Sequence, residues 1–362
     1  MVRTVDKVRA SAPQLEGVVP YDPKYLPARA YLSANENPSD VDLEIRRQIE
    51  SEIRKVNLNR YPDPLANELR EMIADANGLE RDWVLIGNGG DELLFNTALA
   101  WGGPGRTFLN LPPTFSVYAN NARITGTKTI DIPRLDDDGF SIDEARVLEL
   151  ARSGDAFDFT IIATPNNPTG LRARPEFMEE LLDATDALVM ADEAYFEFSR
   201  NTMRPYLDRN ANLVILRTFS KAFSLAGVRI GYILAHPDVI REYIKVRQPY
   251  SVDAISQAVA RVVFRNRSSF EPNIKQIISE RERVSEALRT IPGIHVYPSD
   301  SNWVLFKMED ADRAWQYLYD KGTLIRDLSS APMLEDCLRV TIGTEEQNDG
   351  FLAELKEFAL NA

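Results

Sequence analysis

The chain has 362 residues, a length typical of two domains at about 150 residues per domain. With 44% hydrophobic and 27% charged residues, it has the composition of an ordinary globular protein, which excludes collagenous, mucin-like and disordered classes. Its 42 Lys and Arg residues against 55 Asp and Glu residues give a net charge of −13, which repels phosphate backbones and anionic membranes and so disfavours nucleic-acid and membrane binding.

Cysteine and histidine are scarce. The single cysteine, Cys337, excludes an intrachain disulfide, and its alternating apolar setting predicts a packed strand thiol rather than a nucleophile. Only His236 and His295 are present, which argues against histidine-dependent triads and multi-histidine zinc sites, so no metal is expected. The N-terminus lacks the apolar core of a signal peptide and no run of about 18 apolar residues occurs, so we expect a cytoplasmic protein.

The first 44 residues predict an N-terminal arm and extended segment, because five prolines between residues 11 and 40 leave little periodicity. Apolar spacing then predicts helices over 41–56 and 64–76. From there short apolar runs predict strands at 83–86, 107–111, 129–132, 159–163, 187–191, 213–216 and 230–235, interleaved with helices near 91–101, 114–122, 141–151 and 175–184. Almost continuous apolar strands between helices favour a mostly parallel sheet covered on both faces.

After about residue 253 the pattern changes. Long helices are predicted at 253–267 and 271–290, followed by strands near 293–296, 303–307 and 337–342 and by helices at 310–321 and 345–360. We therefore expect a large α/β domain over 45–253 and a smaller α+β domain over 254–362.

The segment 213–231 contains the first candidate site. An apolar strand leads into a turn with two hydroxyl groups, Thr218 and Ser220, and then Lys221 among apolar neighbours. Such a setting favours the neutral amine, which attacks a carbonyl carbon to form a Schiff base, and the hydroxyl groups are suited to donate to a phosphate. The alternative for this segment alone is a surface lysine that extends from a turn into water.

Three further segments carry polar groups at strand ends. Asp192 and Tyr195 follow one apolar strand, and Asn167 follows another and precedes a proline. Gly90 and Asp91 lie in a glycine-rich turn before an apolar helix, whose N-terminus suits an anion. Taken singly, each segment has another interpretation. The Asp192 segment is compatible with a metal site or a helix cap, the Asn167 segment with a plain turn, and the Gly90 segment with an ordinary glycine loop.

One cofactor explains all four segments. Pyridoxal phosphate needs a lysine for its aldehyde, a carboxylate for its ring nitrogen, donors to its phenolate oxygen and a cup for its phosphate. The segments resemble those of fold-type I pyridoxal-phosphate aminotransferases of classes I and II, and in particular the histidinol-phosphate aminotransferase family. The resemblance extends over nearly the whole chain and includes the motifs at 32–38, 60–62, 112–118, 301–306 and 338–344. Small departures occur at Gly89-Gly90-Asp91 and at Ser224.

The resemblance implies a role for each matching residue. Lys221 would be the Schiff-base lysine, Asp192 the partner of the ring nitrogen, and Tyr195 a donor to the phenolate oxygen, and these three form the expected catalytic set. Further cofactor contacts would come from Asn167 at the phenolate oxygen, Phe115 against the ring, and Gly90, Asp91, Thr218, Ser220 and Arg229 at the phosphate.

The family also implies a homodimer with shared sites, in which Tyr61 reaches the cofactor phosphate of the neighbouring subunit. Arg339 would bind the carboxylate of the amino donor or acceptor, Arg326 the substrate phosphate, and Asn35 is a further substrate-binding candidate.

The expected activity is transamination between histidinol phosphate and 2-oxoglutarate, giving imidazole acetol phosphate and glutamate, a reaction of histidine biosynthesis. An aminotransferase for aromatic or other amino acids and an amino-acid phosphate decarboxylase on the same fold are the alternatives. A cofactor-binding regulator without turnover is disfavoured, because a protein that only binds the cofactor does not need the full lysine, carboxylate, tyrosine and arginine set.

Overall fold

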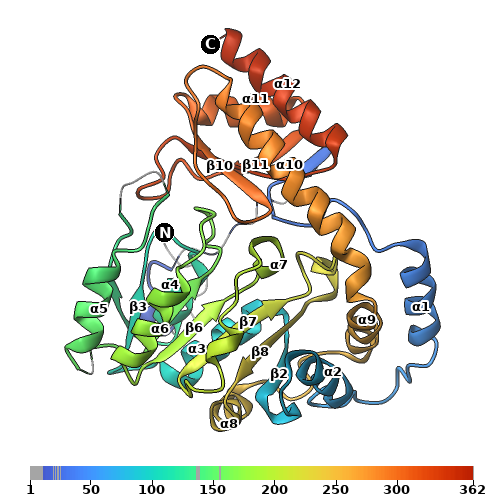
Figure 1. Cartoon of the computed structure of the whole chain (residues 1–362), viewed down its shortest axis with the longest axis vertical. Helices are drawn as coiled ribbons and strands as arrows, with labels where there is room; N and C mark the ends of the chain where they lie inside the picture. Colours follow the sequence, from blue (N-terminus) through green and yellow to red (C-terminus); the bar gives the residue numbers. More distant parts are fainter. Residues whose placement is uncertain are drawn as a thin grey trace, which may run out of the picture.

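The computed structural model describes residues 11–18, 20, 22, 24, 26–135, 139–154 and 156–361. Most of its mass surrounds a seven-stranded sheet, and a second sheet with the long helix α10 lies toward the C-terminus (Figure 1). The first ten residues of the expected N-terminal arm lie outside the described part.

The large sheet has the strand order β2-β8-β7-β6-β5-β3-β4. Its strands are β2 (Val84–Asn88), β3 (Thr107–Asn110), β4 (Lys128–Asp131), β5 (Phe159–Ala163), β6 (Leu188–Asp192), β7 (Leu213–Thr218) and β8 (Ile230–Ala235). All neighbouring pairs are parallel except the two that involve β8, which runs antiparallel to β2 and β7. Every residue of β5, β6, β7 and β8 is buried, which confirms the mostly parallel, two-sided sheet expected from their apolar runs.

Helices cover both faces of this sheet. Alternate residues of one strand enter different cores: Leu188 and Met190 pack with α3, α4 and α8, whereas Val189 and Ala191 pack in the larger cluster with α2, α5, α6 and α9. The helices are α1 (Leu43–Ile53), α2 (Asn67–Asn77), α3 (Gly89–Trp101), α4 (Val117–Ile124), α5 (Glu144–Arg152), α6 (Pro175–Ala184), α7 (Phe196–Ser199), α8 (Pro237–Val246) and α9 (Ala254–Arg265).

The second sheet has the order β1-β11-β12-β10-β9 and is antiparallel except where β1 pairs with β11. Its strands are β1 (Ala30–Leu32), β9 (His295–Val296), β10 (Trp303–Lys307), β11 (Thr323–Asp327) and β12 (Cys337–Thr341), and its helices are α10 (Glu271–Arg289), α11 (Ala311–Asp320) and α12 (Glu345–Asn361). Short 3-10 turns cover Pro13–Leu15, Arg81–Trp83, Arg204–Tyr206, Ala226–Val228 and Arg267–Phe270.

The division into 1–44, 45–253 and 254–362 stays a prediction. Two contacts cross its boundaries: β1 belongs to the C-terminal sheet, and α9 packs against α1 and α2 beside the large sheet.

Cys337 is buried and carries no disulfide, and burial raises the pKa of its thiol to about 11, as expected for a packed strand cysteine. No helix in the described ranges is long and apolar enough to cross a membrane.

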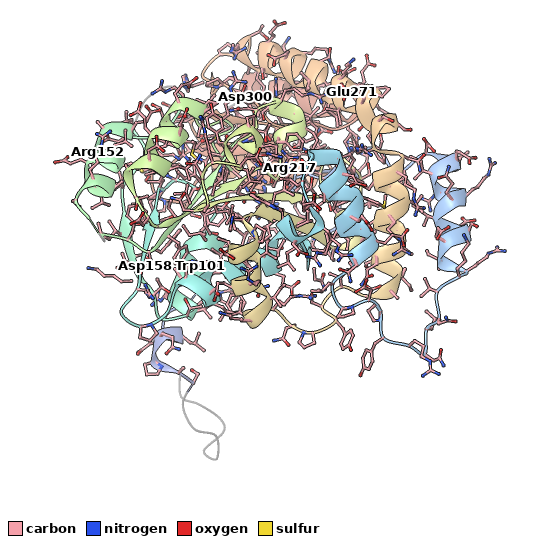
Figure 2. All side chains as sticks on the ribbon, turned by 60° about the horizontal axis from the view of Figure 1, so that its bottom comes forward. Trp101, Arg152, Asp158, Arg217, Glu271 and Asp300 are labelled. Atoms are coloured by element: carbon pink, nitrogen blue, oxygen red, sulfur yellow. The ribbon has the colours of Figure 1, made fainter. Side chains whose placement is uncertain are left out.

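A polar cavity of about 580 Å³ lies at the amino ends of β5 and β6. Trp101, Arg152 and Asp158 line it (Figure 2). Asp158 forms an ion pair with Arg106 at 2.5 Å, so these two charged residues of the cavity wall neutralise each other. The larger cavity is at the opposite, carboxyl ends of the strands, where ligands of open α/β sheets bind.

Candidate active site

A cavity of about 780 Å³ lies where the carboxyl ends of β5, β6 and β7 meet the second sheet. The structure brings nearly all of the sequence-predicted site residues to its wall: Asn35, Gly90, Asp91, Phe115, Asn167, Asp192, Tyr195, Thr218, Ser220, Lys221, Arg229, Arg326 and Arg339. Tyr61 does not line this cavity. Parallel strands end at the same edge of a sheet, and therefore residues far apart in sequence converge there.

Lys221 follows β7 and is half-buried. Its Nζ donates a hydrogen bond of 2.8 Å to the backbone oxygen of Ala34 and lies 5.9 Å from the centre of the Tyr195 ring. Burial, with a smaller contribution from the positive charge of Arg339, lowers the pKa of the Lys221 amine to about 8. A larger fraction of this amine is therefore neutral near neutral pH than in an ordinary lysine.

Asp192 is the last residue of β6 and is buried. Its carboxylate accepts a hydrogen bond of 2.5 Å from the Tyr118 hydroxyl and one of 3.1 Å from the backbone N–H of Ala194. Burial raises the pKa of Asp192 to about 6, and these two donors partly oppose that rise. A buried carboxylate at the cavity wall is suited to pair with a ligand cation.

Tyr118 is a site residue that sequence reasoning did not single out. It is the second residue of α4, and burial together with the negative charge of Asp192 raises the pKa of its hydroxyl. The motif 112–118 contained it, but only the fold brings it to Asp192, which lies 74 residues away in the chain.

An anion-binding arrangement lies at the start of α3. Arg229 immediately precedes β8 and contacts the Asp91 carboxylate at 3.0 Å and the Ser220 hydroxyl at 3.5 Å. A Cβ atom on Gly231 would lie 2.7 Å from the backbone nitrogen of Gly90, so only glycine lets β8 approach this turn. The N-terminus of a 13-residue helix, two hydroxyl groups and an arginine suit a phosphate.

Asn167 and Arg339 are in contact across the cavity, since Arg339 Nη1 donates to Asn167 Oδ1 at 2.5 Å. Arg339 Nη2 donates to the backbone oxygen of Ser33 at 2.6 Å. Phe115 contacts the Tyr118 ring edge-on, with 5.6 Å between ring centres. The stacking of Phe115 on a cofactor ring stays a prediction.

Arg326 and Arg339 are directly opposite residues of β11 and β12. Opposite residues of an antiparallel pair project to the same face, so the two arginines place two positive charges close together. Arg326 also donates to the backbone oxygen of Asp22 at 3.3 Å, and both arginines line the cavity. The pair is therefore a candidate subsite for an anionic substrate group.

A buried ion pair between Glu193 and Arg217 connects the end of β6 to β7. Glu193, next to Asp192, accepts from Arg217 of β7 at 2.9 Å, from Thr202 at 2.8 Å and from the backbone N–H of Met203 at 2.6 Å. Arg217 lies in the interior of the molecule (Figure 2). These contacts tie the turn after β6 to β7, and so fix Asp192 relative to the strand that precedes Lys221.

The side chains of this cavity fit pyridoxal phosphate. A half-buried amine, a buried carboxylate that has no cationic partner within 4 Å among the described residues, and hydrogen-bond donors at Arg229, Ser220 and the start of α3 all lie on its wall. Together with the mostly parallel sheet, these side chains match the fold-type I class, to which the class I and II aminotransferases belong. The crystal structure of histidinol-phosphate aminotransferase from Sinorhizobium meliloti in complex with pyridoxal-5'-phosphate has the same fold, with a TM-score of 0.87 at 22% identity over 98% of this chain and 99% of that chain.

Sequence comparison narrows the class. A family model described as "Aminotransferase class I and II" matches residues 30–355. A histidinol-phosphate aminotransferase from Chlorobaculum tepidum is 35% identical over 91% of this chain and 94% of its own length. One from Thermococcus kodakarensis is 39% identical over 91% of this chain and 93% of its own length. The chain belongs to the class I and II aminotransferases, and within them to the histidinol-phosphate aminotransferase family.

Proposed function

We propose that this aminotransferase uses pyridoxal phosphate to transfer the amino group of histidinol phosphate to 2-oxoglutarate, giving imidazole acetol phosphate and glutamate. The observation that carries the proposal is the convergence of Lys221, Asp192 and the Arg326–Arg339 pair on one cavity. The names of the relatives at 35% and 39% identity support the choice of amino substrate.

Different side chains of the cavity would bind different parts of the cofactor. Pyridoxal phosphate supplies an aldehyde and a ring that accepts the electron pair left when the substrate's Cα–H bond breaks. Arg229, Ser220 and Thr218 would hold the phosphate, and Asp192 would pair with the ring nitrogen. Tyr195 and Asn167, which line the same cavity, would donate to the phenolate oxygen.

Lys221 would move the proton. Its pKa of about 8 leaves enough neutral amine at neutral pH for the nitrogen to take the proton from the substrate's Cα and to deliver it to the carbon that comes from the cofactor's aldehyde. Placement at the end of β7, beside Asp192 at the end of β6, keeps the amine on the cavity side of the sheet.

Arg326 and Arg339 would bind the anionic groups of both substrates. Their opposite positions on β11 and β12 place two cationic side chains on one face of the sheet, which attracts a phosphate or a carboxylate. Each charge-assisted contact contributes about 1.5 to 3 kcal/mol, which corresponds to roughly 10- to 100-fold in affinity or rate.

Arg326→Ala is therefore expected to lower kcat/KM for histidinol phosphate by about 10- to 100-fold, because the phosphate loses one charged donor. The reaction with histidinol, which has no phosphate, should change much less. Steady-state kinetics with the two substrates measures the difference, and Arg313→Ala, an exposed α11 residue paired with Asp310, serves as the control.

Two results would redirect the proposal. Equal kcat/KM for histidinol phosphate and histidinol in the parent would favour an aminotransferase for aromatic or other amino acids. Release of carbon dioxide from an amino-acid phosphate would favour the decarboxylase alternative on the same fold.

We also propose a homodimer in which Tyr61 completes the partner's site. Tyr61 is 81% exposed and stacks on Tyr250 with 4.5 Å between ring centres, and nearby Leu58 is 80% exposed. Exposed apolar side chains that lie together, as the Tyr61 and Tyr250 rings do, suit burial between subunits. A mixture of Lys221→Ala and Tyr61→Ala subunits is expected to regain activity, because one of the two sites in a mixed dimer would be intact. A monomer in light scattering at assay concentration would contradict it.

A further inference from the structure

Three consecutive residues after β1 contact three side chains of the candidate active site. The backbone oxygen of Ser33 accepts from Arg339 at 2.6 Å, and that of Ala34 accepts from Lys221 at 2.8 Å. The Asn35 side chain then donates from Nδ2 to the Tyr195 hydroxyl oxygen at 3.2 Å. The segment leaves the second sheet and ends against residues of the large sheet, so it joins the two sheets at the site.

Asn35 is held in a fixed position. It is only 1% exposed and has a φ of 55°, a left-handed conformation that asparagine and glycine tolerate better than most residues. Its backbone N–H donates to the Thr341 hydroxyl oxygen at 2.9 Å, and its backbone oxygen accepts from Asn302 at 3.0 Å. Both partners belong to the strand region of the second sheet.

Thr341 also orients the Asn35 amide. Because its hydroxyl oxygen accepts from the Asn35 backbone, its proton is free to donate to Asn35 Oδ1, which lies 3.1 Å away. The amide oxygen therefore faces Thr341, and the amide nitrogen faces Tyr195. The Tyr195 oxygen accepts in this contact, and a phenol that accepts a hydrogen bond can also donate its own proton, here on the wall of the cavity.

We propose that Asn35 is a positioning residue, which aims the Tyr195 hydroxyl as a hydrogen-bond donor into the cavity, toward the phenolate oxygen of pyridoxal phosphate. This inference rests on the proposed function, since it assumes that cofactor. A phenol that accepts a hydrogen bond is a stronger donor, because polarisation passes along a chain of hydrogen bonds. Thr341, Asn35 and Tyr195 form such a chain from the second sheet to the cavity.

The test is a pH titration of the visible absorbance of the lysine-bound cofactor in the holoenzyme. The negative charge of the phenolate oxygen stabilises the proton on the nitrogen that joins Lys221 to the cofactor. A hydrogen bond to the phenolate oxygen disperses this charge and so lowers the pKa of that nitrogen. A weaker bond from Tyr195 therefore raises the pKa of that nitrogen. Asn35→Gly keeps the left-handed backbone, and we expect it to raise the spectral pKa by about 0.5 to 1.

A double variant separates positioning from general structural loss. Tyr195→Phe should raise the spectral pKa further than Asn35→Gly, and the double variant should shift it no more than Tyr195→Phe alone. Thr341→Val removes the hydroxyl that orients Asn35 and should reproduce part of the rise, whereas Thr341→Ser keeps the hydroxyl and should restore the parent value.

An unchanged spectral pKa in Asn35→Gly, or additive shifts in the double variant, would overturn the positioning role. The failure of the proposed function looks different. In that case the parent itself would show no visible band with pyridoxal phosphate, whatever residue stands at position 35.

Discussion

Lys221→Ala is expected to abolish transamination while leaving a folded chain. The substitution removes both the amine that bonds to the cofactor's aldehyde and the group that moves the substrate proton, so we expect the half-reaction with glutamate to slow by about 10⁴-fold or more. Single-turnover measurement of 2-oxoglutarate formation tests the rate, and the visible band of the lysine-bound cofactor should be missing. Lys275→Ala, at an exposed residue of α10, is the matched control and should react like the parent.

The pH dependence of cofactor attachment adds a second readout. Because the pKa of Lys221 is about 8, the neutral fraction of the amine is one half near pH 8 and levels off about one to two pH units above that. The rate at which cofactor-free protein acquires the visible band should follow that curve. A rate that keeps rising to above pH 10 would indicate an ordinary exposed lysine, and full turnover in Lys221→Ala would assign the chemistry to another residue.

The large sheet was predictable because its strands are continuous apolar runs between helices. The seven runs from residue 83 to 235 all form strands, and their order places their polar end residues at one edge. Two strands of the second sheet escaped prediction. β1 has three residues, and its partner β11 lies almost three hundred residues away, so neither shows a pattern that is recognisable locally.

A helix was missed for a different reason. His236-Pro237 reads as punctuation in the sequence, but the His236 side chain caps α8 by accepting from the Asp238 backbone N–H, and Pro237 occupies the first turn. Proline is well tolerated at that position because its missing N–H would have no partner inside the helix.

The candidate site was predictable in its membership and less so in its contacts. Strand ends identify Lys221, Asp192 and Asn167 because parallel strands deliver their carboxyl ends to one place. The hydrogen bond from Tyr118 to Asp192 and the opposition of Arg326 to Arg339 depend on strand register and helix docking. No spacing in the sequence encodes these pairings, because each joins segments that meet only in the folded chain.

Asp192→Asn is expected to slow the reaction and to stabilise the cofactor-free protein. A neutral amide no longer favours a protonated ring nitrogen, so proton abstraction should fall by about 10²- to 10³-fold, the size of effect typical for loss of one aligned electrostatic partner. The amide oxygen of the substituted side chain would still accept from the Tyr118 hydroxyl, which binds the Asp192 carboxylate at 2.5 Å in the parent, so local packing is preserved.

The effect on stability follows from the raised pKa of Asp192. Its folded-state pKa of about 6 exceeds the ordinary value of 3.8, so the unfolded chain ionises first as the pH rises. Below pH 3.8 the carboxyl is protonated in both states and leaves the free energy of unfolding unchanged. Between pH 3.8 and 6 the free energy of unfolding falls, because the buried carboxyl must ionise, and above pH 6 the loss is constant. A shift of this size corresponds to about 3 kcal/mol of lost stability at pH 8.

Cofactor-free Asp192→Asn should therefore be more stable than the cofactor-free parent by about 3 kcal/mol at pH 8, with the difference vanishing near pH 4. Denaturant titrations at both pH values measure it, and Asp183→Asn, at an exposed residue of α6, should leave stability and rate unchanged. Pyridoxal phosphate should reverse the order, because a ring cation relieves the buried charge only in the parent. Equal cofactor-induced stabilisation of parent and variant would mean that Asp192 is a structural residue and that another group faces the ring nitrogen.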